Sequence, residues 1–385
     1  MLNFTFHNST KIIFGKGQIK ALTSEIPEGA KVLMTYGGGS IKTNGIYQQV
    51  CAALEEHEWF EFSGIEPNPK YDTLIKALEI IRERDIDYLL AVGGGSVIDG
   101  TKFIAAAALY QGEDPWDILA KRHTITEALP LGAVLTLPAT GSESNGGSVV
   151  TRNGNKLAFG NPLVRPTFAV LDPATSLSLS DRQVSNGVVD AFIHTMEQYL
   201  TYPVNGSVQD RFAEGLLLTL IEEGPKALQP DFKDDLTVRA NIMWSASLAL
   251  NGLIGSGVPQ DWATHMIGHE LTGTYNIDHA RTLSIILPAV MKVCREDKRD
   301  KLIQYARRVW GLKEGDEENC IDQAIQLTED FFQKMNMPIR LSDVQLSASD
   351  IDTIIPKLEL HGMTKLGEHR NITPEVSRKI LEMAL

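Results

Sequence analysis

Residues 87–99 read DYLLAVGGGSVID, an apolar run of strand length followed by three glycines and then by a helical pattern. The run does not alternate with polar residues, which is typical of a parallel strand buried on both faces. A plain turn needs only one glycine, and three adjacent glycines lose more backbone entropy on folding. They let the backbone approach a phosphate, and the free N–H groups of the next helix can bind it. We therefore predict a nucleotide-binding turn at Gly94, Gly95 and Ser96, with a ligand-free turn as the alternative.

A second glycine turn follows the apolar run at 31–36 and comprises Gly37, Gly38, Gly39 and Ser40. The first turn reads GGGS rather than the GxGxxG of ordinary Rossmann folds. In a dinucleotide site, an acidic side chain near such a strand end binds the ribose 2′-hydroxyl and repels a 2′-phosphate. Residues 37–43 contain no acidic side chain and include Lys42. The second turn therefore favours NADP over NAD, and a turn without a ligand is again the alternative.

A third group of candidate ligands follows the apolar run at 131–137, where small hydroxyl and amide side chains are dense. In open parallel sheets, ligands lie at this carboxyl edge of the strands. The candidates in this loop are Thr136, Thr140, Ser142 and Asn145. A polar loop without a ligand explains the composition equally well. Lys156 is either a solvated turn residue or a cofactor contact, and the sequence does not separate the two.

The chain divides into two regions of different pattern. Before residue 175, helical patterns alternate with apolar runs at 31–36, 87–92, 131–137 and 167–171. This alternation predicts a mostly parallel sheet that is covered on both faces. Later patterns are helical, at 181–201, 207–228, 235–252, 259–275, 297–311, 317–335 and 373–384. We predict a Rossmann-like α/β nucleotide-binding domain at residues 1–175 and an all-helical domain at residues 176–385.

Composition and charge exclude several classes of protein. The chain has 385 residues and a net charge of −13 without a block of Lys and Arg, which argues against nucleic-acid binding. The longest apolar run, 103–109, is too short to cross a membrane. The three cysteines lack the spacing of a zinc site or a disulfide framework, and the first residues lack a signal-peptide pattern. We expect a soluble cytoplasmic protein.

Histidine and aspartate side chains in the second region form a candidate metal site. Asp190 and His194 are four residues apart in an apolar helical pattern, as are His265 and His269, and His279 follows. This spacing places both members of a pair on one helix face. Buried Asp and His are costly unless they are paired or bind a metal. Nitrogen and oxygen donors without thiolate suit Fe²⁺ or Zn²⁺. The alternative is that these are ordinary core or surface histidines.

A phosphate-binding turn and a metal site in one chain predict hydride transfer to a carbonyl, in the cleft where the two domains meet. Over essentially its whole length the sequence resembles the iron-containing (group III) alcohol dehydrogenase family. It is most similar to the branch of butanol dehydrogenases and NADPH-dependent aldehyde reductases. The matching segments are residues 35–40, 93–99, 135–145, 258–265 and 279–288, together with Asp190 and His194. The fold that this implies is a Rossmann-like domain followed by a helical domain, the architecture of dehydroquinate synthase.

The resemblance also implies roles for individual residues. It implies that a divalent metal, Fe²⁺ or Zn²⁺, is bound by Asp190, His194, His265 and His279. It implies that His269 lies beside the nicotinamide without binding the metal, and we expect His269 to pass a proton to the product oxygen. The implied NADP(H) contacts are Gly95, Ser96, Asp99, Thr136, Thr140, Ser142, Asn145, Lys156 and Leu179. Many relatives have an Asp that enforces NAD near the place of Gly38, so the resemblance favours NADP. Ala280 departs from the Gly usual after the last ligand.

The sequence also predicts an oligomeric state and a substrate, and it leaves two alternative functions. The resemblance implies a homodimer, and residues 5–14 have the pattern of a strand that can pair with another subunit. A small aldehyde or alcohol is the expected substrate. A dehydroquinate synthase-like lyase is one alternative, but its sugar-acid substrate calls for Lys and Arg, which are scarce around Asp190 and His265. A non-catalytic, metal-stabilised nucleotide-binding protein is another, and no sensory or DNA-binding segment supports it.

Overall fold

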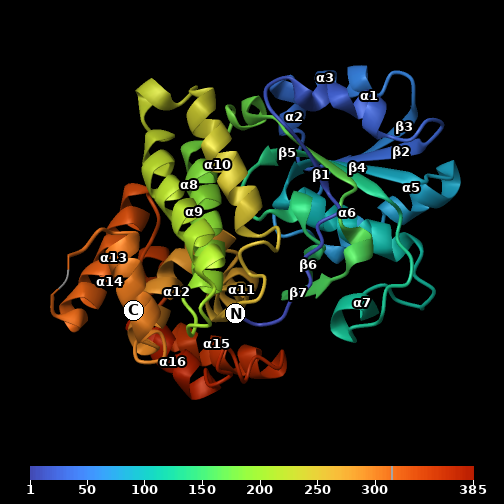
Figure 1. The fold of residues 1–385 in the computed structure, drawn as a ribbon. Coiled ribbons are helices and arrows are strands. Elements are labelled where there is room, and N and C mark those ends of the chain that lie inside the picture. Colours follow the sequence, from blue (N-terminus) through green and yellow to red (C-terminus); the bar gives the residue numbers. More distant parts are fainter. Residues whose placement is uncertain (314) are drawn as a thin grey trace. The chain divides into compact units, whose positions relative to one another are not determined.

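The computed structural model describes residues 1–313 and 315–385. Within these residues the chain folds into two compact units, whose elements are labelled in Figure 1. The sheet unit comprises residues 7–179 and 234–247. The helical unit comprises residues 1–6, 180–233 and 248–385.

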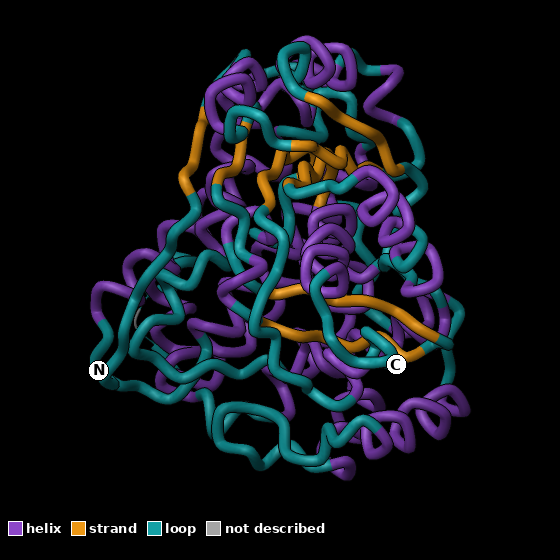
Figure 2. Tube along the Cα trace, turned by 90° about the vertical axis from the view of Figure 1, so that its right-hand side faces the viewer, coloured by secondary structure: helices purple, strands orange, loops and turns teal. Residues whose placement is uncertain are grey.

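The sheet unit is built on a parallel sheet with the strand order β1-β8-β5-β4-β2-β3. Its strands are β1 (Lys11–Phe14), β2 (Lys31–Tyr36), β3 (Glu58–Phe62), β4 (Tyr88–Gly94), β5 (Leu131–Leu137) and β8 (Phe168–Leu171). Its helices are α1 (Leu22–Glu25), α2 (Ser40–Thr43), α3 (Ile46–Ala53), α4 (Tyr71–Leu74), α5 (Ala77–Arg84), α6 (Gly95–Ala108), α7 (Asp117–Ala120) and most of α10 (Leu236–Ala249). Figure 2 shows the strands, in orange, among the helices. The predicted Rossmann-like parallel sheet is confirmed.

The two faces of this sheet are buried against different helices. On β4, Leu89 and Ala91 pack into a core with side chains of α5 and α6. The intervening Leu90 and Val92 pack into a second core with side chains of α1 and α3. Successive strand residues point to opposite faces, so a strand between two helical layers must be apolar at every position. This explains why the uninterrupted apolar runs predict the central strands.

The predictions missed some elements and misjudged one. The first strand begins at Lys11, and residues 5–10, predicted to belong to it, form no strand. The sequence reasoning did not find β3 or the antiparallel hairpin of β6 (Gly147–Arg152) and β7 (Asn155–Gly160). The turn of this hairpin, Asn153-Gly154, has positive φ at both residues, 52° and 76°, which suits a tight hairpin.

The helical unit has its own core. Its helices are α8 (Asp181–Tyr199), α9 (Ser207–Lys226), α11 (Ala263–Tyr275), α12 (His279–Val293), α13 (Arg299–Arg308), α14 (Glu317–Lys334), α15 (Ala348–Leu360) and α16 (Pro374–Met383). Apolar side chains of α11, α12, α15 and α16 pack together, and α8 packs against α9 and α12. Helix α8 begins in a capping box, in which Ser180 and Gln183 exchange hydrogen bonds. Nearly every residue of α8 from Val184 onward is buried.

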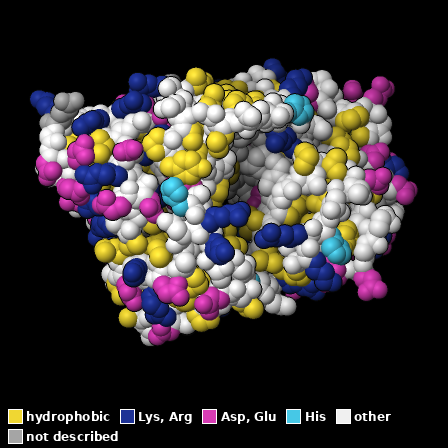
Figure 3. Space-filling model, turned by 60° about the horizontal axis from the view of Figure 1, so that its bottom comes forward, with side chains coloured by type: hydrophobic (Ala, Val, Ile, Leu, Met, Phe, Trp, Pro, Cys, Tyr) yellow, Lys and Arg dark blue, Asp and Glu magenta, His cyan; other side chains and the backbone are white. Residues whose placement is uncertain are grey.

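Across the described residues, no helix combines the length and the apolar character needed to cross a membrane. On the face shown in Figure 3, Lys and Arg side chains are interspersed with Asp and Glu. This mixture accords with the ordinary charged content and the net charge of −13.

Candidate functional site

The predicted nucleotide turn joins β4 to α6. Strand β4 ends at Gly94 and helix α6 begins at Gly95, so the free N–H groups of α6 follow the glycines directly. A Cβ on Gly95 would lie 2.5 Å from Thr140 Oγ1, and one on Gly94 would lie 2.9 Å from Leu137 Cβ. Close packing against the neighbouring loop therefore requires glycine here whether or not a ligand binds. Thr140, a predicted cofactor contact, is brought beside the turn.

The second glycine turn joins β2 to α2. Gly39 has a positive φ of 95°, which explains glycine there, whereas a Cβ on Gly38 would meet nothing within 4 Å. Lys42 Nζ lies over the rings of Tyr36 and Tyr47, at 5.2 and 4.7 Å from their centroids. Helix α2 is a single turn that begins at Ser40.

An acidic residue lies beside this turn, although none occurs within it. Glu61, on the neighbouring strand β3, accepts hydrogen bonds of 3.0 Å from both Tyr36 Oη and Tyr47 Oη, and Lys42 Nζ lies 3.4 Å away. Burial raises the pKa of Glu61, but the donors outweigh burial and the net shift is downward. The sequence reasoning considered residues 37–43 alone and missed Glu61. A contact between neighbouring strands is visible only once the strand order is known.

A buried lysine holds the loop after β5. Lys102 Nζ, on α6, donates to Ser142 Oγ at 2.8 Å, to Asn145 Oδ1 at 3.1 Å and to Gly147 O at 2.7 Å. Ser142 Oγ in turn donates to Asp99 Oδ1 at 2.5 Å. Burial lowers the pKa of Lys102 to about 8. Three predicted cofactor residues, Asp99, Ser142 and Asn145, thus belong to one internal network whose centre, Lys102, the sequence reasoning missed.

The remaining predicted cofactor residues divide into two groups. Lys156 Nζ donates to Asn68 Oδ1 at 2.9 Å, and Asn68 N donates to Ser96 Oγ at 3.3 Å, so Asn68 joins Lys156 to the nucleotide turn. Thr136 lies near the end of β5 and is half-buried. Leu179 is half-buried after the last strand and hydrogen-bonds through its backbone to Ser176. The cofactor roles of these residues stay predictions.

The candidate metal centre lies in the helical unit, where three helices each contribute one residue. Asp190 comes from the middle of α8, His265 from the first turn of α11, and His279 is the first residue of α12. Each offers one ligand atom, and these atoms all lie within 4.8 Å of one another. Asp190 and His265 are each 4% exposed, and His279 is half-buried. The sequence spacing predicts these residues, and the fold brings them together.

His194, the fourth predicted ligand, lies beside this group. Its Nδ1 is 3.6 Å from Asp190 Oδ1, and its ring centroid is 4.4 Å from that of His265. Burial lowers the pKa of His194 to about 4, so its ring is neutral at pH 7. Among the described residues, His194 Nδ1 and His265 Nε2 are buried without a hydrogen-bond partner. Buried imidazole nitrogens without partners, next to a carboxylate, fit a divalent cation that would satisfy them.

The helices that carry the ligands are fixed by further contacts. Glu197, one turn along α8, accepts a hydrogen bond of 2.7 Å from Thr264 N and contacts His265 Nδ1. Burial lowers the pKa of His265, but Glu197 and Asp190 outweigh burial and raise it to about 9. Asp278, which precedes His279, accepts hydrogen bonds from Arg182 Nε at 2.7 Å and from Asn186 Nδ2 at 2.8 Å. The sequence reasoning identified neither Glu197 nor Asp278.

His269, the predicted catalytic residue, lies one turn beyond His265 on α11. Its ring centroid is 4.8 Å from that of His279 and 6.2 Å from that of His265. It is half-buried, and it is outside the group of ligand atoms defined above. Its predicted role beside the metal, rather than as a ligand, stays a prediction. Ala280, the predicted departure from the family pattern, is buried.

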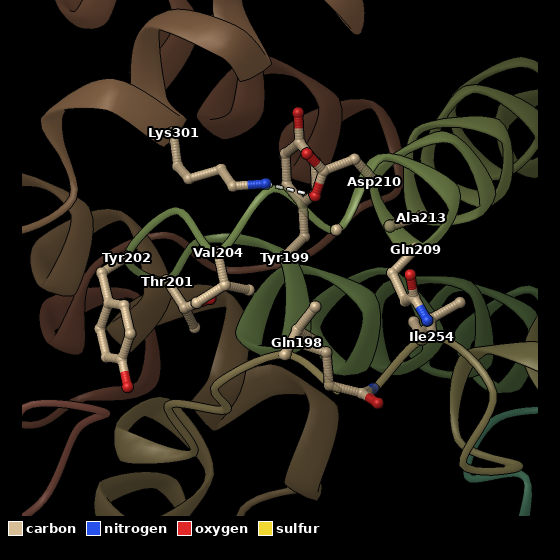
Figure 4. A pocket seen from close by; sticks show the side chains of 12 residues that line it. Gln198, Tyr199, Thr201, Tyr202, Val204, Gln209, Asp210, Ala213, Ile254 and Lys301 are labelled. Carbon is tan, nitrogen blue, oxygen red and sulfur yellow. Dashed lines mark hydrogen bonds and ion pairs between the residues drawn. The ribbon is translucent and has the colours of Figure 1, made fainter. Parts of the chain in front are cut away.

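A separate cavity in the helical unit is too small for a substrate. Figure 4 shows its lining, at the C-terminal end of α8, where Lys301 forms an ion pair with Asp210. Its volume of about 10 Å³ is room for about one water molecule. Its lining, as far as the described residues define it, does not include the candidate ligands.

The chain is similar to known proteins over its whole length. Residues 9–173 match the model of the family described as iron-containing alcohol dehydrogenase, and residues 184–385 match the model of its C-terminal part. The chain is 56% identical to the NADPH-dependent aldehyde reductase YqhD of Escherichia coli K12, over the full length of both. It is 40% identical to a probable NADH-dependent butanol dehydrogenase of Bacillus subtilis, also over the full length of both.

Solved structures agree with these relatives. The crystal structure of YqhD from E. coli K-12 has a TM-score of 0.98 at 56% identity, covering 100% of this chain and 99% of that one. The structure of the NADH-dependent butanol dehydrogenase A of Thermotoga maritima has a TM-score of 0.94 at 36% identity, with the same coverage of both chains.

Proposed function

The chain belongs to the iron-containing alcohol dehydrogenase family, and from this premise we propose that it is a metal-dependent, NADP(H)-linked aldehyde reductase that produces primary alcohols such as butanol. The single observation that carries this proposal is 56% identity to an NADPH-dependent aldehyde reductase over the full length of both chains. The clustering of Asp190, His265 and His279 supports it, because these residues could hold a metal ion and a metal ion can activate an aldehyde carbonyl for hydride transfer.

Residues of the helical unit would bind the metal and deliver a proton to the product. Asp190, His194, His265 and His279 would hold the metal, which when bound supplies Lewis acidity while NADPH supplies the hydride. The low pKa of His194 keeps its ring neutral, so this residue can offer a lone pair without first losing a proton. His269 is half-buried and close to His279, and it would deliver a proton to the alcohol oxygen from water. Histidine suits this task because its ordinary pKa lies near neutrality.

The cofactor proposal assigns the glycine turns and the loop after β5 to NADPH. Gly37–Ser40 would lie at the adenosine ribose, where residues 37–43 hold no carboxylate that would repel a 2′-phosphate. Glu61 is nearby, but Tyr36, Tyr47 and Lys42 occupy its oxygens. The relatives include both NADPH-dependent and NADH-dependent enzymes, so NADP is the finer part of the proposal. Either Fe²⁺ or Zn²⁺ suits the donor set, and metal analysis of protein purified without added metal would decide between them.

Assembly, location and domain roles belong to the same proposal. We infer a homodimer, because β1 lies at the edge of the sheet, where unpaired backbone groups can accept another strand, and Phe14 on it is 41% exposed. A cytoplasmic location is supported by Cys51, Cys294 and Cys320, all of which are free thiols. Residues 1–175 would bind the nucleotide, and residues 176–385 would bind the metal.

The proposal is tested by replacing His279 with Ala and following two quantities. Bound metal should fall to a small fraction of the wild-type content. NADPH oxidation with butanal, followed by the absorbance of the reduced nicotinamide, should fall by about 1000-fold or more, because several kcal/mol of carbonyl activation is lost. Undiminished turnover in metal-stripped protein would overturn the proposal. Absence of any butanal-dependent oxidation by the wild type would instead favour a lyase or a non-catalytic nucleotide-binding protein.

A further inference from the structure

We propose that Glu197 is a positioning residue for the metal centre, which turns Nε2 of His265 toward the metal and holds the imidazole proton of the metal-bound ring on Nδ1. This inference rests on the proposed metal site and goes beyond the predicted ligands. Glu197 is 2% exposed, and it is not among the four residues expected to bind the metal. A carboxylate buried this completely is costly unless hydrogen-bond donors surround it.

The donors that surround Glu197 all come from the start of α11. Glu197 Oε1 accepts from Thr264 N at 2.7 Å and from His265 N at 3.3 Å, and Glu197 Oε2 contacts His265 Nδ1. Trp262, at the N-terminal boundary of α11, has a positive φ of 65° and provides no side-chain cap. Glu197 therefore satisfies the backbone donors that a capping side chain would normally satisfy, at the helix end that favours negative charge.

The same carboxylate determines which nitrogen of the His265 imidazole carries the proton. An ionised carboxylate only accepts hydrogen bonds, so the nitrogen of His265 that contacts it must carry the proton. In a singly protonated ring the lone pair is then on Nε2, which lies 3.8 Å from Asp190 Oδ1 within the group of candidate ligand atoms. A ligand histidine commonly donates its other N–H to a carboxylate in this way, which fixes the ring and raises its basicity.

The backbone of Glu197 also contacts the segment that precedes α11. Its backbone oxygen accepts a hydrogen bond of 2.9 Å from Asp261 N, so the turn before α11 is tied to α8 at two points of the same residue. Asp190, His194 and Glu197 follow one another along one helix at intervals of four and three residues, which places them on one face. The carboxylate of Asp190 and the carboxylate that orients His265 are therefore carried by one rigid element.

Replacing Glu197 with Gln tests the inference through metal affinity. A Gln amide has one acceptor oxygen and one donor nitrogen, so it cannot accept from both the backbone N–H groups and His265 Nδ1. Either the amide donates to Nδ1 and pushes the proton onto Nε2, or it leaves backbone donors of α11 unsatisfied. We expect the dissociation constant for Zn²⁺, measured by competition with a chelator, to rise by about 10-fold to 100-fold.

A matched control comes from a second carboxylate–histidine contact, whose carboxylate lies on α11, the helix that carries His265. Glu270 Oε1 lies 2.6 Å from His361 Nδ1, and neither residue is a candidate ligand. Glu270→Gln removes one negative charge, as Glu197→Gln does, and we expect its affinity for Zn²⁺ to equal that of the wild type. If Glu197→Gln binds Zn²⁺ as tightly as the wild type, or if both variants lose affinity equally, the inference is wrong.

A measurement on the wild type covers the case in which Glu197→Gln does not fold. In zinc-loaded protein with ¹⁵N-labelled histidine, NMR should show His265 protonated at Nδ1 and without a proton at Nε2. The opposite assignment would overturn the inference. Failure of the wild type to bind Zn²⁺, Fe²⁺ or Co²⁺ at all is a different outcome. It would disprove the proposed metal site itself, not only the role of Glu197 within it.

Discussion

Two buried lysines, one in each unit, solve the problem of a buried charge in different ways. Lys102 in the sheet unit is 0% exposed and donates to a hydroxyl, an amide oxygen and a backbone carbonyl, all of them neutral. Lys298 in the helical unit is 3% exposed, and its Nζ lies 2.8 Å from Asp261 Oδ2 and 2.9 Å from Glu368 Oε1. The cofactor loop is thus held by a cation among neutral oxygens, whereas the turn before α11 is held by an ion-paired cluster.

The pKa values of the two lysines show what this difference does. Burial lowers the pKa of Lys102 to about 8, and the more distant Asp99 and Glu143 only partly oppose it. Burial also lowers the pKa of Lys298, but Asp261 and Glu368 outweigh it and raise the pKa to about 12. The sign of the shift is therefore set by direct carboxylate partners rather than by burial. Removing each lysine should accordingly have a different cost.

The largest expected effect follows from removing Lys298. Lys298→Met leaves Asp261 and Glu368 buried without their counter-ion, so we expect it to lower the free energy of unfolding by about 3–5 kcal/mol. Lys102→Met leaves neutral oxygens unsatisfied, with an expected cost of about 1–3 kcal/mol. Urea unfolding of both variants beside the wild type, near pH 7, measures the difference. Equal losses would show that the two sites do not differ as their partners suggest.

The second largest expected effect is a difference between the two lysines in how the free energy of unfolding depends on pH. In the unfolded chain Lys102 has its ordinary pKa of 10.5, so between pH 8 and 10.5 the unfolded state binds more protons than the folded state. The free energy of unfolding of the wild type relative to Lys102→Met should therefore rise with pH across this window, by up to about 3 kcal/mol. A flat difference would contradict a lowered pKa.

Lys298 is the control for that experiment. Its folded pKa of about 12 keeps it protonated in both states below pH 10.5, so the wild type relative to Lys298→Met should show a constant difference in the same window. The stabilisation should be lost only as the pH rises from 10.5 toward 12. In the difference between wild type and variant, the contributions of tyrosines and other groups that titrate in alkaline solution cancel.

The smallest expected effect concerns the cofactor turn at Gly38, away from Lys102. Because a Cβ at Gly38 meets nothing within 4 Å, Gly38→Asp should fold normally and keep its metal content. A carboxylate beside a 2′-phosphate costs about 1–4 kcal/mol, so the KM for NADPH should rise by 10-fold or more while that for NADH changes little. Gly38→Asn has nearly the same shape without the charge and is the matched control. Equal effects of both variants would place the 2′-phosphate elsewhere.

The sequence predicted the central sheet well because of the particular chemistry of its strands. Strands β2, β4, β5 and β8 are buried on both faces and consist of uninterrupted apolar runs. Strand β3 was missed because its residues are only partly buried and include two Glu. Helix α12 was missed because Pro288 lies inside it, and a proline in a sequence usually indicates the end of a helix. The Asn153-Gly154 pair in the hairpin was a usable turn signal that the sequence reasoning did not use.

The candidate site was predictable only where its residues are close in sequence. Asp190 with His194, and His265 with His269, are recognisable because helical spacing places each pair on one face. Lys102 and Glu197 were not recognisable, because their partners Ser142 and His265 lie 40 and 68 residues away in the chain. The spacing of a local motif can be read from a sequence, whereas the groups that orient it come from other elements and depend on the fold.

Helix α8 has a consequence for how this chain tolerates change in length. Asp190, His194 and Glu197 share one face of a buried helix. Inserting or deleting a single residue between positions 190 and 197 would rotate one part of that face by about 100° relative to the other. Such a change would separate the proposed ligand from the carboxylate that orients His265, even if every side chain were retained. Substitutions along this helix can be compensated by neighbours, but a shift of its register cannot.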